Sequence, residues 1–135
     1  MTIRHAACTC GQLQVVCEGD PPRISMCHCL ACQQRSGSVF SCQAWFKREQ
    51  ITTILGDTTT FTRVTDAGNS AVYRFCPVCG TTLFWEAEKV FPGMMAVAVG
   101  AFADPNFPPP GHSVWERRRH AWVAELCDVA ARHFE

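Results

Sequence analysis

Short apolar segments separated by turn residues recur along most of the chain. Several alternate apolar and polar positions with the period of two that is typical of a half-buried strand, and they are rich in Val, Ile, Thr, Phe and Trp. Turn residues fall between them, as in GDPP at 19–22 and DAGN at 66–69. The pattern predicts an all-β domain, mainly strands with little helix, with strands at residues 13–17, 39–46, 51–55, 59–64, 71–75, 82–86 and 95–100.

Helical signals are limited to two segments. Residues 30–36 predict a short helix that Gly37 ends, because glycine adopts the left-handed backbone conformation found after a helix C-terminus. Residues 122–133 are apolar at helical spacing and predict a terminal helix or an irregular edge segment. The chain has no internal repeat, low-complexity tract or linker. At 135 residues we expect a single domain spanning 1–135.

Composition excludes some classes of partner. Twelve basic side chains balance twelve acidic ones, so the chain lacks the positive field that binds a phosphate backbone, and we expect no nucleic-acid partner. Residues 1–10 lack the apolar stretch of a signal peptide, and the longest apolar run, MMAVAVGAFA from Met94, is half a membrane span. We therefore expect a cytoplasmic protein that has no membrane partner; a homodimer remains an open option.

The cysteines carry the candidate chemistry. Seven of the ten fall into three tight groups, CTC, CHCLAC and CPVCG. In a reducing compartment this grouping favours metal ligation over disulfide bonds. Zinc takes four thiolates tetrahedrally, and CxC and CxxC turns present two sulfurs to one ion. The spacing predicts two zinc ions, one bound by Cys8, Cys10, Cys76 and Cys79, the other by Cys27, Cys29 and Cys32.

The two predicted sites differ in how many ligands they have. Structural zinc sites have four protein ligands, whereas catalytic sites have three and keep one position open. We therefore expect the four-cysteine site to stabilise the fold and the three-cysteine site to perform chemistry. Gly11 and Gly80 each follow the second cysteine of an outer pair, where a positive φ leaves backbone amides free to donate to the thiolates. A redox CxxC is the weaker interpretation of Cys76 and Cys79, because a redox pair needs no CxC partner.

Spacing alone leaves the three-cysteine site open to a second interpretation. We expect Cys27 and Cys29 on one side of an extended strand, with His28 on the other side. The alternative is a second structural zinc completed by His28, Cys42 or another side chain. Cys17, Cys42 and Cys127 have apolar neighbours and are expected to be small buried residues. The other histidines stand alone in the sequence and are not expected to be ligands: His5, His112, His120 and His133.

Five motifs together resemble the glutathione-dependent formaldehyde-activating enzyme (GFA) family, namely CTCGQL, CHCLACQQRSGSVF, FCPVCGTTLFW, AVAVGAFADP and HSVWERRRHAWV. The resemblance covers nearly the whole chain and implies an Mss4-like zinc-binding β-sheet sandwich. It implies the same seven ligands, with Cys27, Cys29 and Cys32 at the catalytic zinc. It further implies a carbon–sulfur lyase-type enzyme that adds glutathione or a similar thiol to formaldehyde or another small aldehyde, giving S-hydroxymethylglutathione in the family's named reaction.

Two other functions compete with this hypothesis. A non-catalytic, zinc-stabilised protein-interaction module of Mss4-like fold would require a closed second zinc site. A thiol redox enzyme similar to the zinc-bearing methionine sulfoxide reductases would need a reactive cysteine outside the zinc sites, and no cysteine there has evident activating neighbours.

The sequence offers several candidates for the groups that bind the carboxylates of a thiol substrate and for the proton donor. Arginine forks suit the carboxylates of a glutathione-like thiol, and the candidates are Arg35, Arg74, Arg117, Arg118 and Arg119. For the three consecutive arginines we favour the simpler interpretation of an exposed strand that keeps the protein soluble, and we do not count them as site residues. Glu86, Glu116 or water could supply the proton that the reaction needs, but no spacing rule supports one of them.

Overall fold

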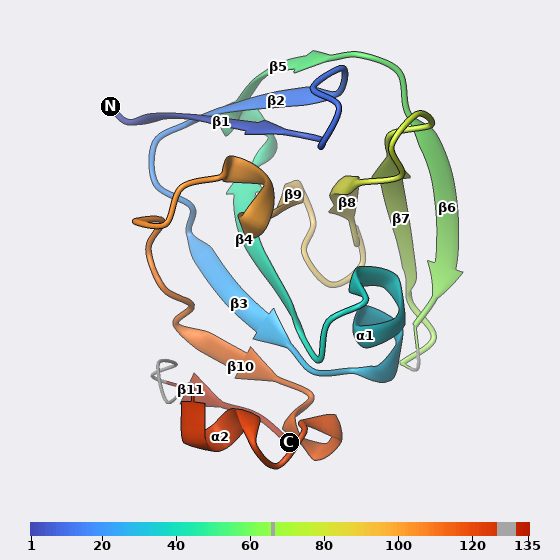
Figure 1. Cartoon of the computed structure of the whole chain (residues 1–135), viewed down its shortest axis with the longest axis vertical. Helices are drawn as coiled ribbons and strands as arrows, with labels where there is room; N and C mark the ends of the chain where they lie inside the picture. The colour runs from blue at the N-terminus through green and yellow to red at the C-terminus, as the bar shows by residue number, and fades with distance from the viewer. Residues whose placement is uncertain (66, 127–131) are drawn as a thin grey trace.

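Eleven strands in two sheets form the framework of the part of the chain that the computed structural model describes, residues 1–65, 67–126 and 132–135 (Figure 1). The prediction of a mainly β fold is confirmed. The strands are β1 (Ile3–Ala7), β2 (Gln14–Glu18), β3 (Arg23–Cys27), β4 (Ser41–Lys47), β5 (Ile51–Leu55), β6 (Thr59–Val64), β7 (Ser70–Phe75), β8 (Thr82–Glu86), β9 (Met94–Ala98), β10 (His112–Val114) and β11 (Arg132–His133).

Helices are short and lie at the ends of strands. The α-helices are α1 (Leu30–Ser36) and α2 (Val123–Leu126), and single 3-10 turns are η1 (Arg48–Gln50), η2 (Val99–Phe102) and η3 (Glu116–Arg118). The prediction of α1 is confirmed at both ends, and Gly37 ends it with a φ of 71° and an amide that donates to the Gln33 carbonyl. Within the described residues, no helix is long and apolar enough to cross a bilayer.

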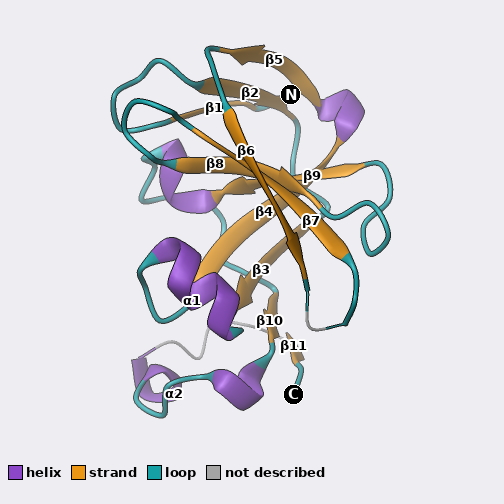
Figure 2. Cartoon of the chain, turned by 90° about the vertical axis from the view of Figure 1, so that its right-hand side faces the viewer, coloured by secondary structure: helices purple, strands orange, loops and turns teal. Residues whose placement is uncertain are grey.

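The large sheet has the strand order β11-β10-β3-β4-β9-β8-β7-β6, and the small sheet has the order β1-β2-β5. Neighbouring strands are antiparallel except β10, which runs parallel to both β3 and β11. The small sheet lies at the top of Figures 1 and 2, where it covers the upper part of the large sheet. The strands predicted at 51–55, 59–64 and 82–86 match β5, β6 and β8, whereas the others differ at their ends.

The main core lies between the two sheets. Alternation along β4 directs Ala44 and Phe46 to this side, where they join Val15 and Cys17 of the small sheet. Phe46 is fully buried, and burying such a side chain contributes about 1.5–3 kcal/mol to folding. The expected burial of Cys17 is confirmed, Cys42 is partly buried, and Cys127 lies outside the described residues.

The other side of the large sheet has a separate aromatic cluster. Gln43 and Trp45 alternate with the core residues of β4 and so point to this opposite side. Trp45 joins Tyr73 and Trp85 in a second buried cluster that is distinct from the main core. Cys27 belongs to this side too, because it pairs with Ser41 two positions before Gln43. One side of the sheet therefore builds the core, and the other receives the candidate chemistry.

Candidate metal centres

The four outer cysteines meet where the turn after β1 approaches the turn after β7. Their sulfur atoms all lie within 4.8 Å of one another. The Sγ atoms of Cys8 and Cys10 are 3.6 Å apart, and those of Cys10 and Cys76 are 3.7 Å apart. Zinc–sulfur bonds of about 2.3 Å in a tetrahedron give sulfur–sulfur separations of about 3.8 Å. Cys8, Cys10, Cys76 and Cys79 therefore fit one zinc ion.

Glycine shapes both turns of this group. The Gly11 amide donates to the Cys8 carbonyl, and the Gly80 amide donates to the Cys76 carbonyl, each at 2.9 Å. Gly11 has a φ of 83° and Gly80 a φ of 79°, which other residues rarely adopt. Both turns thus end with a positive-φ glycine, but its amide bonds the carbonyl three residues back in the first turn and four residues back in the second, rather than a thiolate.

Hydrogen bonds favour the thiolate form of two outer thiols, Cys76 and Cys79, whereas the pKa of Cys10 is raised to about 12. Burial raises the pKa of Cys76, but donors that include the Cys79 amide and the Gln12 side chain, 3.0 Å from Cys76 Sγ, lower it below its ordinary value. Hydrogen bonds from Thr81 lower the pKa of Cys79 to about 5. Since metals bind the thiolate, these contacts favour metal binding.

The three inner cysteines converge at the junction of β3 and α1. Their sulfur atoms also lie within 4.8 Å of one another, and all three residues are buried. Cys27 ends β3, whereas Cys29 is the N-cap of α1 and its sulfur accepts a hydrogen bond from the Cys32 amide at 3.3 Å. The expectation that Cys27 and Cys29 share one extended strand is therefore wrong, because the chain turns into the helix at Cys29. Cys32 completes the group from the first turn of α1.

In the described residues, no other Cys, His, Asp or Glu joins the three inner thiols. His28 is buried with its Nε2 atom 2.9 Å from the Ser113 hydroxyl. Cys42 pairs with Met26 in the β3–β4 register, so it points to the side of the sheet opposite Cys27. Neither residue closes the site, in contrast to the alternative that spacing left open. His5, His112, His120 and His133 also lie outside both thiol groups.

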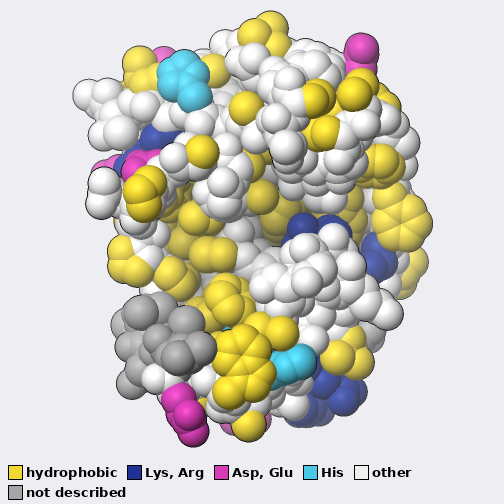
Figure 3. Space-filling model, in the orientation of Figure 1, with side chains coloured by type: hydrophobic (Ala, Val, Ile, Leu, Met, Phe, Trp, Pro, Cys, Tyr) yellow, Lys and Arg dark blue, Asp and Glu magenta, His cyan; other side chains and the backbone are white. Residues whose placement is uncertain are grey.

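The inner thiols line a cavity of about 370 Å³, a volume typical of small-molecule sites. Its floor is the aromatic side of the large sheet. Hydrophobic side chains also gather in a hollow at the middle of the face that Figure 3 displays. Five aromatic residues line the cavity: Trp45, Tyr73, Trp85, Phe91 and Trp115. The outer thiols do not line it. One thiol group is thus built into the fold, while the other opens onto space for a ligand.

A buried polar chain runs along the cavity floor beside these thiols. The Ser41 hydroxyl donates to Gln43 Oε1 at 2.8 Å, and Gln43 Nε2 donates to the Ser25 hydroxyl at 3.1 Å. Sequence reasoning missed these residues. The signal was present in the alternation of β4, where Ser41 and Gln43 occupy every second position.

Charge is distributed unevenly among the inner thiols. Hydrogen bonds with Cys27 and Cys29 lower the pKa of Cys32, and the Ser41 hydroxyl and the Arg35 charge act in the same direction. Hydrogen bonds with its two neighbours raise the pKa of Cys27. Negative charge therefore collects on Cys32, at the end of the group that faces Arg35.

The family model for glutathione-dependent formaldehyde-activating enzymes matches residues 3–118. The chain belongs to this family. The matched segment contains all seven cysteines of the two thiol groups, the strands of the cavity floor and α1. No curated protein matched the chain.

The structure divides the candidate arginines of this GFA-family chain into three kinds. Arg74 pairs with Glu86 at 2.6 Å, and Arg119 pairs with Glu116 at 3.1 Å, so carboxylates already neutralise their charges. Arg35 instead packs over Trp85, with 4.3 Å between its guanidinium carbon and the ring centre. The remaining two candidates, Arg117 and Arg118, are exposed in η3 rather than on a strand.

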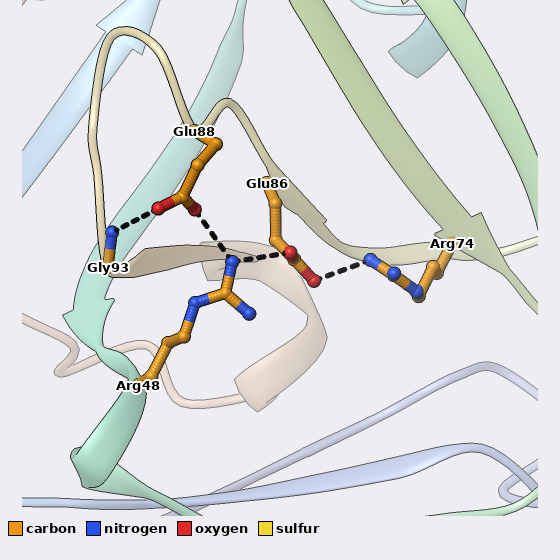
Figure 4. Close-up of polar contacts among 5 residues, drawn as sticks. All are labelled: Arg48, Arg74, Glu86, Glu88 and Gly93. Atoms are coloured by element: carbon orange, nitrogen blue, oxygen red, sulfur yellow. Dashed lines mark hydrogen bonds and ion pairs between the residues drawn. The ribbon is translucent and has the colours of Figure 1, made fainter.

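An ion-pair network supports one wall of the cavity (Figure 4). Arg48 Nη2 lies 2.6 Å from Glu86 and 2.8 Å from Glu88, and Glu88 accepts the Gly93 amide at 3.0 Å. These contacts close the loop 87–93, which carries Phe91 to the cavity. Glu86 is therefore committed to two arginines and does not line the cavity, which argues against its being the proton donor.

Proposed function

We propose that this protein is a zinc-dependent carbon–sulfur lyase-type enzyme that adds a thiol such as glutathione to formaldehyde or another small aldehyde. Family membership supports this reaction class. The observation that carries the proposal is a group of three thiols with no fourth described ligand, opening onto a cavity of about 370 Å³. A site closed by a fourth side chain would instead favour the interaction module.

In this proposal Cys27, Cys29 and Cys32 hold the reactive zinc, and Cys8, Cys10, Cys76 and Cys79 hold a structural zinc. Zinc at the inner thiols would lower the pKa of an incoming thiol, so that it is ionised at neutral pH. The nine described cysteines are all free thiols, which suits a reaction in the reducing cytoplasm.

The chain itself supplies orientation and proton handling. The aromatic walls hold the thiol and the aldehyde next to each other with little water, which lowers the entropic cost of bringing two reactants together. The thiolate sulfur bonds to the carbonyl carbon, the C=O π electrons move to oxygen, and that oxygen takes a proton. Ser25 and Gln43 are the buried hydrogen-bonding side chains on the floor, so we assign them to hold the carbonyl oxygen while water delivers the proton.

Exchange NMR with ¹³C-labelled formaldehyde and glutathione tests this function. We expect the zinc-loaded protein to accelerate exchange between free formaldehyde and S-hydroxymethylglutathione. Cys29→Ser should abolish the acceleration while the protein stays folded, because a serine oxygen can still cap α1. If no pair of several thiols and small aldehydes exchanges faster with the wild-type protein, the enzyme hypothesis is wrong and the interaction module is favoured.

A further inference from the structure

Two arginines that line the cavity have no carboxylate partner in the described part of the chain. They are Arg23, on β3, and Arg63, on β6. Arginine remains charged in proteins even where burial lowers its pKa, as it does for Arg23. The Nε atom of Arg23 is buried without a hydrogen-bond partner. The cavity therefore contains positive charge that no described carboxylate neutralises.

Other contacts hold these two side chains in place. The Arg23 guanidinium lies over the Phe91 ring, 5.3 Å from its centre. The Arg63 side chain is hydrogen-bonded to Tyr73, and against the effect of burial this contact together with the nearby Cys29 and Cys32 thiols raises its pKa. Contacts of this kind fix the position of an arginine without cancelling its charge, which leaves its donors available to an anion.

The two arginines belong to strands that are well separated in the large sheet. In the large sheet, β4, β9, β8 and β7 separate β3 from β6. Trp45, Trp85 and Tyr73 of the intervening strands line the cavity between the arginines, and the inner thiols line the same cavity. The arrangement suits a ligand whose thiol binds the metal site and whose two ends each carry a carboxylate.

Arg35 has different surroundings from Arg23 and Arg63. Its guanidinium packs over Trp85 and Tyr73, its Nε and Nη2 atoms are buried, and its charge lowers the pKa of Cys32. Arg35 does not line the cavity of the inner thiols, unlike Arg23 and Arg63, so we assign it to the thiol group rather than to the ends of a ligand.

We infer that Arg23 and Arg63 bind the two carboxylates of the thiol substrate, so that the site selects a thiol carrying two carboxylates over a neutral thiol. This inference rests on the proposed function and adds specificity-determining residues to it. Each carboxylate gains a charge-assisted hydrogen bond from a guanidinium, and a neutral thiol of the same shape does not.

The kinetic test compares glutathione with glutathione diethyl ester, which keeps the thiol and neutralises both carboxylates. We expect Arg23→Met and Arg63→Met each to lower kcat/KM for glutathione by about tenfold to a hundredfold, mainly through KM, because a charge-assisted hydrogen bond is lost. The same variants should change kcat/KM for the diester little. Arg117→Met removes an exposed arginine that does not line the cavity, and it should leave both substrates unchanged.

A binding test separates this inference from the proposed reaction. S-methylglutathione keeps both carboxylates but cannot react, and its binding to the zinc-loaded protein can be measured by calorimetry. We expect Arg23→Met and Arg63→Met to weaken this binding without changing the zinc content. If no thiol reacts but this arginine-dependent binding is observed, the proposed reaction is wrong and the inference stands.

Two outcomes would overturn the inference while leaving the reaction intact. The first is that wild type and variants use glutathione and its diester equally well. The second is that the variants lose zinc and lose activity toward all thiols alike. That result would show that the arginines balance the negative charge of the metal site instead of binding the substrate.

Discussion

Replacing Cys76 with serine tests whether the outer thiol group stabilises the fold. Cys76 and Cys10 lie 66 positions apart in the sequence, and their contact joins the turn after β1 to the turn after β7. Structural zinc contributes about 10–16 kcal/mol of apparent free energy at pH 7. The net stability of a domain is only about 5–15 kcal/mol. We therefore expect Cys76→Ser to be largely unfolded at 25 °C.

Two other cysteines provide matched controls. Cys17 is as fully buried as Cys76 but belongs to neither thiol group. Cys17→Ser should cost only the burial of a hydroxyl, about 1–3 kcal/mol, and should remain folded with two zinc ions. Cys29→Ser alters the inner group, whose ligands lie within six residues of one another, and should remain folded with one zinc ion.

Circular dichroism measures the folded fraction in this experiment, and elemental analysis under reducing conditions measures the zinc content. Wild type should contain close to two zinc ions per chain. A folded Cys76→Ser variant with two zinc ions would refute the division into a structural site and a reactive site. Equal destabilisation by Cys76→Ser and Cys17→Ser would refute the metal contribution itself.

Three further substitutions test the main core, the end of α1 and the ion-pair network. Phe46→Ala should lower the free energy of unfolding in urea by about 3–5 kcal/mol, because it empties the space between the two sheets. Gly37→Ala should cost about 1–2 kcal/mol and lower the Tm, since alanine must then adopt a φ of 71° at the end of α1. The Gly93 amide and Arg48 lower the pKa of Glu88, so its contribution is present above the ordinary value of 4.5 and is lost as the pH falls below it. The stability difference between wild type and Glu88→Gln should accordingly shrink in acid, and a difference that stays constant to pH 3 would contradict the network in Figure 4.

The sequence was sufficient to predict the features that depend on local order. Cys27, Cys29 and Cys32 lie within six residues, so their spacing alone brings them near one another. The C-terminal end of α1 was predictable because the left-handed conformation of Gly37 ends only the helical turn directly before it. The outer pairs were predictable for a different reason, since each presents two sulfurs and neither can complete a site alone.

The cavity could not be predicted, because it is formed by contacts between residues that lie far apart in the sequence. Arg23 and Arg63 are far apart in the sequence and meet one cavity only because the large sheet places β3 and β6 around it. β10 was missed because a three-residue strand has too short a pattern to recognise, and it forms through parallel pairing with β3. Cys42 was a candidate ligand until the β3–β4 register was known, since only the register shows which side of the sheet it faces.

A single strand links the metal site, the polar floor and the charge that we assign to substrate binding. Along β3, alternate positions bring Arg23, Ser25 and Cys27 to the cavity, while Ile24 and Met26 face the opposite side, where apolar clusters bury them. A shift of one residue in the pairing of β3 with β4 would exchange these two sets. It would bury the Arg23 charge in a hydrophobic core and remove a ligand from the inner site at the same time. The burial of Ile24 and Met26 therefore fixes the register of β3 as well as stabilising the fold. That register keeps the Cys27 thiol, the Ser25 hydroxyl and the Arg23 guanidinium on the side of the sheet that a substrate can reach.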